Sequence, residues 1–151
     1  MKPEGGNTLP SILNTIKLML GIGKDYKHFD KVIIQHINAA LMILTQIGVG
    51  PPNGFSIKGP GAKWSDFLTD MSKLEAVKTY IYLRVKPVFD PSTSSVVTTS
   101  MENVAKELEW RLNINAEDVD LEAPEYLDTL AAIFDDEDDE DDTSDDEYEE
   151  L

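Results

Sequence analysis

Apolar residues recur at the spacing of an α-helix in four segments of the chain. The first begins at Thr8-Leu9-Pro10-Ser11, which offers capping hydroxyls, and ends before Gly21. The second begins near Lys27 and ends before Gly48, where a left-handed residue belongs. The four apolar stripes are Leu13, Ile16 and Leu20; Phe29, Ile33, Ile37, Ala40, Leu41 and Leu44; Leu74, Val77, Ile81 and Val85; and Val97, Met101, Val104, Leu108 and Leu112. The pattern predicts an all-α fold, a compact bundle of about four helices.

A segment rich in glycine and proline separates the second helix from the third. Residues 48–63 hold five glycines and three prolines, which is too many for a helix interior. Phe55-Ser56-Ile57 is the only strand-like triplet in this segment. We therefore predict a projecting loop or a small β-hairpin here, and a return of helical pattern from Trp64 to Leu68.

Local signals mark the ends of the last two helices. Ser72 followed by Glu75 matches a capping box, in which each side chain bonds a free backbone amide. Pro87 lacks an amide proton and predicts a kink near the end of the third helix, which Asp90-Pro91 closes. The hydroxyls of Ser92–Ser95 then supply an N-cap for the last helix.

Net charge divides the chain into two parts. The 151 residues include 13 basic and 29 acidic side chains, for a net charge of −16. All 13 bases and ten of the acids lie in residues 1–115, which carry +3, whereas residues 116–151 carry 19 acids and no base. We predict a flexible N-terminus over residues 1–8, a helical domain over 9–115, a linker with a short amphipathic helix over 116–134, and a disordered acidic tail over 135–151.

Residue types used in catalysis or metal binding form no constellation. The chain has no cysteine, which excludes disulfides, a thiolate nucleophile and Cys-ligated metals. Residues 59–65 look like a phosphate-binding loop and residues 118–129 like a calcium loop, but each lacks the residues that its chemistry requires. His28 and His36 have no local triad partners, and a core or helix-flank role is favoured for both. We predict a protein that is not an enzyme and that uses no cofactor or metal.

Membranes and nucleic-acid sequences are poor partners for this chain. The longest apolar run, Ala39–Leu44, has six residues, against the roughly 20 that a membrane-spanning helix needs. The first residues lack the apolar segment of a secretion signal, so we expect a soluble protein with no membrane partner. Readout of a nucleic-acid sequence has little support, because the body carries only +3 and the acidic tail repels phosphate.

Eight short motifs follow one another between about residues 9 and 115. They are Ser11–Lys17 before Leu20-Gly21, Phe29-Asp30 with Ile34–Asn38, Gln46–Pro51, Gly54–Ile57, Trp64–Phe67, Leu74–Leu83, Phe89–Ser92 and Leu108–Asn113. As a set, and in this order, they resemble the head–tail connector (head completion, adaptor) proteins of long-tailed bacteriophages.

This resemblance implies a small, helical structural protein without catalytic activity. It implies a homo-oligomeric ring, expected to be a dodecamer, that lies beneath the portal vertex of the filled capsid and extends the DNA channel. The neighbours are then the portal protein above and a stopper or tail-completion protein below, and genome DNA passes through without sequence readout. The implied location is the head–tail interface of the virion, after synthesis in the cytoplasm of the bacterial host.

The resemblance also suggests regions of contact. The candidate residues of the partner-contact loop are Phe55, Ile57, Lys58, Lys63 and Trp64. The candidate intersubunit residues are Phe67, Tyr82, Trp110 and Arg111. An ordinary solvent loop is the alternative for residues 48–63, and the edge of an amphipathic core is the alternative for the tryptophans.

The chain continues beyond the last motif, where connectors of this family usually end. The linker carries an apolar stripe of Tyr126, Leu127, Leu130, Ile133 and Phe134, which is too short to fold alone. We expect this stripe to dock on the portal or on a neighbouring subunit, while the acids steer assembly or keep DNA from sticking. A tail that only increases solubility is the alternative.

A different class of function stays open beside the connector. An acidic binding module, either a DNA mimic or a histone-like chaperone, would act through the tail. A DNA mimic should present its acids on a folded surface, whereas here they are concentrated in a low-complexity segment. The distribution of charge therefore favours the connector.

Overall fold

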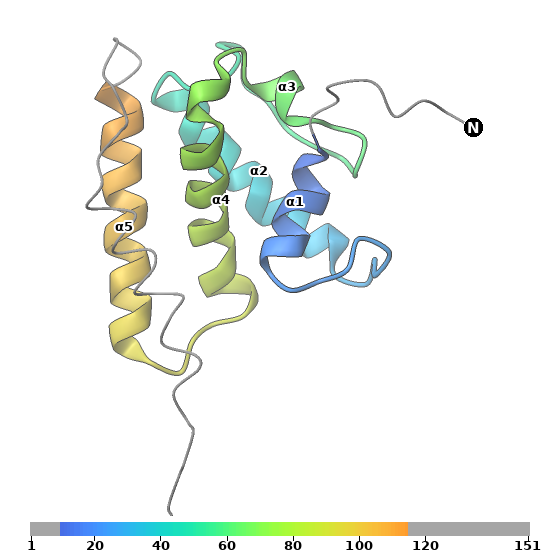
Figure 1. Ribbon diagram of the computed structural model, residues 1–151, viewed down its shortest axis with the longest axis vertical. Coiled ribbons are helices and arrows are strands. Elements are labelled where there is room, and N and C mark those ends of the chain that lie inside the picture. Colours follow the sequence, from blue (N-terminus) through green and yellow to red (C-terminus); the bar gives the residue numbers. More distant parts are fainter. Residues whose placement is uncertain (1–9, 115–151) are drawn as a thin grey trace, which may run out of the picture.

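The computed structural model describes residues 10–114 (Figure 1). These residues contain five α-helices and one 3-10 turn, joined by loops. The elements are α1 (Ile12–Met19), α2 (Asp30–Gln46), α3 (Trp64–Phe67), η1 (Met71–Lys73), α4 (Leu74–Phe89) and α5 (Ser95–Ile114). The all-α prediction is confirmed. The four periodic segments correspond to α1, α2, α4 and α5, and α3 adds a single turn. The predictions for residues 1–8 and 116–151 lie outside the described residues.

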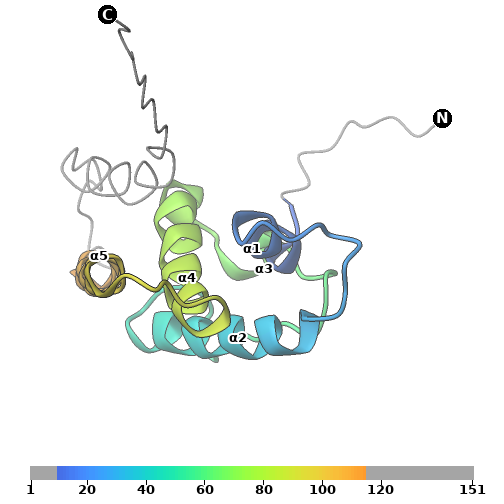
Figure 2. The ribbon, with the colours of Figure 1, turned by 90° about the horizontal axis from the view of Figure 1, so that it is seen from below.

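Helix α4 is the centre of the bundle. It packs against α1, α2 and α5, and Figure 2 shows it between α5 on one side and α1 on the other, with α2 across the base. Four consecutive α4 residues, Tyr80 to Leu83, are buried, and so are Ala76, Val77 and Val85. A helix that meets neighbours on more than one side buries more than one apolar stripe.

The predicted caps of α1 and α2 are present. The Ser11 hydroxyl accepts a hydrogen bond from the Asn14 amide, and Gly21 follows the end of α1 with a φ of 78°. Gly48 has a φ of 94° just after α2, where the left-handed conformation favours glycine. Helix α2 begins at Asp30, three residues later than the predicted start at Lys27, because the chain before it turns back over α1.

The start of α4 differs from the prediction. Ser72 does not cap α4: it lies in η1, where its amide and its hydroxyl both donate to the Asp70 carboxylate. Asp70 is therefore the capping residue, and η1 leads directly into α4 at Leu74. Pro87 lies within α4, and the helix continues through it to Phe89 before ending at Asp90, as Asp90-Pro91 predicted.

Helix α5 is packed on one side only. Its start is capped by Ser94, whose hydroxyl accepts from the Val97 amide at 3.4 Å. Its buried residues are Met101, Val104, Ala105, Leu108 and Leu112, which lie within or next to the predicted stripe. Their main neighbour is α4 (Figures 1 and 2).

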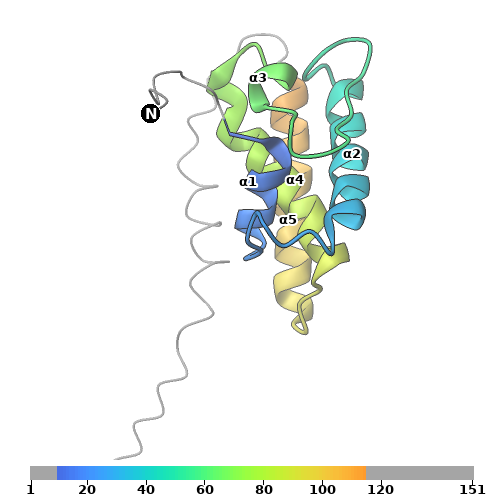
Figure 3. The same ribbon diagram turned by 90° about the vertical axis from the view of Figure 1, so that its right-hand side faces the viewer.

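The segment between α2 and α3 projects less than predicted. It turns beyond the end of α2 and then returns beside that helix toward α3 (Figure 3). Residues 10–114 contain no β-strand, so no hairpin forms; the one isolated bridge joins Ser11 to Lys63. The segment returns because Val49 and Ile57 are buried in the core, which draws both halves of the loop onto the bundle.

Candidate functional site

The loop that precedes α2 is fastened by a buried lysine. Lys17 lies in α1 and is fully buried, and its ammonium group donates to the carbonyl oxygens of Lys24 and Tyr26 at 3.1 and 2.7 Å. The same nitrogen lies 2.7 Å from a carboxylate oxygen of Asp30, in the first turn of α2. A buried ammonium needs such partners because its charge has lost its water. One side chain thus fixes the whole path from α1 to α2.

A neutral side chain fastens the loop that follows α2. The Asn38 amide oxygen accepts from the backbone amide of Ile57 at 2.7 Å, and its nitrogen donates to the Ile57 carbonyl at 3.0 Å. Farther along, the Ile12 amide donates to the Ala62 carbonyl at 3.0 Å. The loop is therefore held by a helix at its middle and by the start of α1 at its end.

Two aromatic residues of α3 complete this attachment. The Trp64 indole is fully buried and donates to the Thr15 hydroxyl of α1 at 3.0 Å. Phe67 is also buried, and its ring lies 5.4 Å from that of Phe55, centroid to centroid. Gly50 approaches the same ring so closely that an added Cβ would lie 2.2 Å from a Phe67 ring carbon. Phe67 is therefore the core residue onto which the loop closes.

A hollow of about 410 Å³ lies beside this contact, between the first turn of the loop and the segment that leads into η1. Its polar side chains are Asp66, Thr69, Asp70 and Lys73. Hydrogen bonds from Ser72 lower the pKa of the Asp70 carboxyl below its usual value, because they stabilise the ionised form. A general acid needs a raised pKa instead, so the Asp70 carboxyl caps η1 and is not suited to donate a proton at neutral pH.

Helix α2 presents an outer face without charge. The chain has no Asp, Glu, Lys or Arg from Val32 to Ile57. Along this face Val32, Gln35, Ala39, Met42 and Gln46 are exposed, Met42 to 55%. A shallow hollow of about 360 Å³ adjoins it, between Met42 and Thr45 of α2 and residues 53–56 of the loop. Surfaces that lack charge and carry exposed apolar side chains are typical of protein contacts.

The far side of α5 carries an exposed aromatic residue. Trp110 is 62% exposed, and the next residue, Arg111, is half-buried and makes an ion pair with Glu107 at 2.8 Å. On the other side, the Tyr80 hydroxyl of α4 donates to the Glu109 carboxylate of α5 at 3.0 Å. Burial raises the pKa of Tyr80 above its usual value, and the adjacent Glu109 carboxylate raises it further.

The structure separates the residues predicted for contact into two groups. Lys58 and Trp110 are exposed, while Phe55, Lys63 and Arg111 are half-buried. Ile57, Trp64, Phe67 and Tyr82 are buried in the core of the bundle. Loop closure on α1 and α2 buries the first three, and packing of α4 on several sides buries Tyr82. The docking stripe from Tyr126 to Phe134 lies outside the described residues.

Sequence reasoning missed the two residues that fasten the loops. Lys17 interrupts an apolar run just before a glycine-rich loop, and that position was the available signal of a buried charge. Asn38 gave no such signal, because a single asparagine in a helix is usually solvent-facing.

Residues 10–114 offer few side-chain groups for metal binding or catalysis. These residues include no group of three or more His, Asp or Glu side chains that could hold a metal ion. His28 is exposed and His36 half-buried. Among the described helices, none has the length and apolar character to cross a membrane.

Comparison with known proteins gives one match. A family model described as "Phage connector protein" matches residues 12–119, which include every described helix. The chain has no match among curated proteins or among solved structures.

Proposed function

The chain belongs to the phage connector protein family, and from this membership we propose that it is a structural subunit of a bacteriophage head–tail connector. In the proposed assembly, copies of the chain form a ring beneath the portal and extend the DNA channel. The portal protein and a stopper or tail-completion protein are the proposed neighbours. Genome DNA passes through this channel without sequence readout, and the ring is part of the virion.

The observation that carries the proposal is the extent of the family match. It spans residues 12–119, which include the entire helical bundle, so the membership rests on the sequence of the whole bundle and not on one motif. The exposed, uncharged face of α2 and the exposed Trp110 of α5 support self-association, because exposed apolar surface is typical of protein contacts.

The described residues give no support to the acidic binding module. A DNA mimic needs a folded surface rich in carboxylates, whereas residues 10–114 contain 12 basic and nine acidic side chains. We therefore keep the connector as the single proposed function.

Imaging by negative-stain electron microscopy tests the proposal. The purified full-length chain should form rings, either alone or on its cognate portal. Trp110 is our proposed intersubunit residue, so Trp110→Ala should lower the fraction of rings at least several-fold while circular dichroism shows unchanged helix content. Val96→Ala is the matched control, since Val96 is a 73% exposed apolar residue on the same helix. Absence of rings in both settings would overturn the connector proposal, and equal ring fractions for the two variants would remove Trp110 from the interface.

A further inference from the structure

The net positive charge of the bundle lies at one edge. Residues 10–114 carry a net charge of +3. Lys17 and Asp30 neutralise each other in the core, and seven bases and seven acids balance over the rest of the surface. The excess comes from five residues, which we call the basic edge: Lys24, Asp25, Lys27, Lys31 and Lys58.

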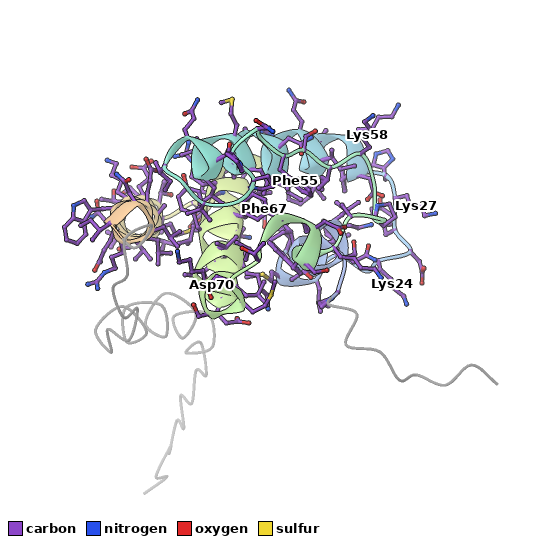
Figure 4. All side chains as sticks on the ribbon, turned by 90° about the horizontal axis from the view of Figure 1, so that it is seen from above. Lys24, Lys27, Phe55, Lys58, Phe67 and Asp70 are labelled. Carbon is purple, nitrogen blue, oxygen red and sulfur yellow. The ribbon has the colours of Figure 1, made fainter. Side chains whose placement is uncertain are left out.

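The buried ion pair explains why this edge is basic. Asp30 is the acid that would otherwise neutralise the lysines around it, but its carboxylate turns inward to Lys17. All four lysines of the basic edge are exposed, and none of them makes a salt bridge within the described residues. Lys24, Lys27 and Lys58 lie along the edge opposite α5 (Figure 4), and Lys31 follows in the first turn of α2.

The same chain supplies a segment of opposite charge. Residues 135–151 include 13 acidic residues and no base. The described chain ends at Ile114 on α5, at the edge of the bundle away from the lysines (Figures 1 and 4). Twenty residues separate Ile114 from Asp135, a length that reaches at most about 70 Å when fully extended. A linker of this length lets the acidic segment reach the basic edge of an adjacent subunit.

We propose that the basic edge binds the acidic segment 135–151 of a neighbouring copy of this chain. The inference rests on the proposed ring. In a head-to-tail ring, one edge of each subunit faces the opposite edge of the next, which brings the end of α5 toward the lysines of its neighbour. Each exposed ion pair contributes little alone, but the acids are tethered and their effective concentration is high.

DNA is the competing polyanion. Its phosphates would contact the same lysines, but the 19 acidic residues of each subunit's C-terminal part repel DNA. The acidic segment, by contrast, is tethered to the assembly and does not have to bind from solution. The tail is the favoured occupant, and its contact should weaken steeply with salt, because exposed charges are screened beyond about 8 Å at physiological ionic strength.

Zero-length carbodiimide cross-linking of the full-length chain tests the proposal. Equal amounts of ¹⁴N- and ¹⁵N-labelled protein are mixed, assembled and cross-linked, and the Lys–Asp/Glu links are identified by mass spectrometry. We expect mixed-isotope links between the basic edge and residues 135–150, at least fivefold more frequent at 50 mM than at 500 mM NaCl. Lys24→Gln, Lys27→Gln, Lys31→Gln and Lys58→Gln together should abolish them, whereas Lys106→Gln, at an exposed site on the balanced surface, should not.

Each alternative result is distinct. Links within one isotope only would place the acidic segment on its own chain, and links spread over all exposed lysines would remove the basic edge as a site; either overturns the proposal. A duplex that displaces the tail links, and that loses binding in the fourfold variant, would assign the edge to DNA and also overturn it. Rings without edge links would reject this inference alone, whereas the absence of both rings and mixed-isotope links would reject the proposed function.

Discussion

The two loops that flank α2 are fastened by different kinds of side chain. Lys17 holds the loop before α2 with a charged group that is fully buried and that requires Asp30 as its partner. Asn38 holds the loop after α2 with a neutral amide that bonds both backbone groups of Ile57. Both attachments satisfy backbone polar groups that would otherwise be buried without partners.

The difference has consequences at the surface. The charged attachment draws a carboxylate into the core and leaves four exposed lysines without an acidic partner among residues 10–114, so the edge beside that loop is basic. The neutral attachment draws no charge inward, and the surface beside the second loop carries no Asp, Glu, Lys or Arg from Val32 to Ile57. The side chains that fix the two loops thus also determine the electrostatics of two neighbouring surfaces.

Removing the charged attachment should have the largest effect. Lys17→Met leaves the Asp30 carboxylate and two loop carbonyls without their partner, and we expect a loss of about 3–5 kcal/mol in the free energy of unfolding. Urea unfolding followed by circular dichroism measures this loss. Lys31→Met is the control, because Lys31 is exposed and makes no salt bridge within residues 10–114, and its effect should stay within about 0.5 kcal/mol. Equal midpoints for the two variants would contradict the role of Lys17.

The close approach of the second loop to α3 provides the next test. Gly50 and Gly54 both have a φ near 90°, but only at Gly50 would an added Cβ meet Phe67. Both alanine variants carry the same backbone strain, and Gly50→Ala should lose about 1–3 kcal/mol more than Gly54→Ala from overpacking. Thermal unfolding of the two proteins measures the difference. Matching melting temperatures would show that the loop can move away from Phe67 without loss of stability.

The neutral attachment should contribute less than the charged one. Asn38→Ala leaves the Ile57 amide and carbonyl without their partner, and we expect a loss of about 1–2 kcal/mol. Gln35→Ala, on the exposed face of the same helix, is the control. Amide hydrogen exchange should also show faster exchange at Ile57 in Asn38→Ala. If Asn38→Ala lost as much as Lys17→Met, the contrast between the two attachments would not hold.

A polar contact between two helices provides a reference for the stability losses expected at the two loops. Tyr80→Phe removes the hydrogen bond to Glu109 and should lose about 1 kcal/mol. Because the folded pKa of Tyr80 is raised above its usual value of 10.0, its contribution is present below about pH 10 and is lost as the pH rises further. Urea unfolding at pH 9 and pH 11 should therefore show a smaller fall in stability for Tyr80→Phe than for the unaltered protein. An identical fall in both would contradict this contribution.

The sequence by itself determined the helices and most of their ends. Apolar spacing located α1, α2, α4 and α5, and the caps Ser11 and Ser94 and the glycines at 21 and 48 lie where they were expected. These features are local: each depends on residues within a few positions along the chain. Eight ordered motifs also led to the connector family, which the family match confirms.

Only the tertiary structure decided which side chains the bundle buries and where its charge remains. Trp64 and Tyr82 are buried because α1 and the neighbours of α4, all distant in the sequence, cover them. The pairing of Lys17 with Asp30 and of Asn38 with Ile57 likewise depends on how the loops return to the helices. Periodicity reports which face of an element is apolar, but it carries no information on a second neighbour or on a polar partner across a loop, and these contacts form only when the chain is packed.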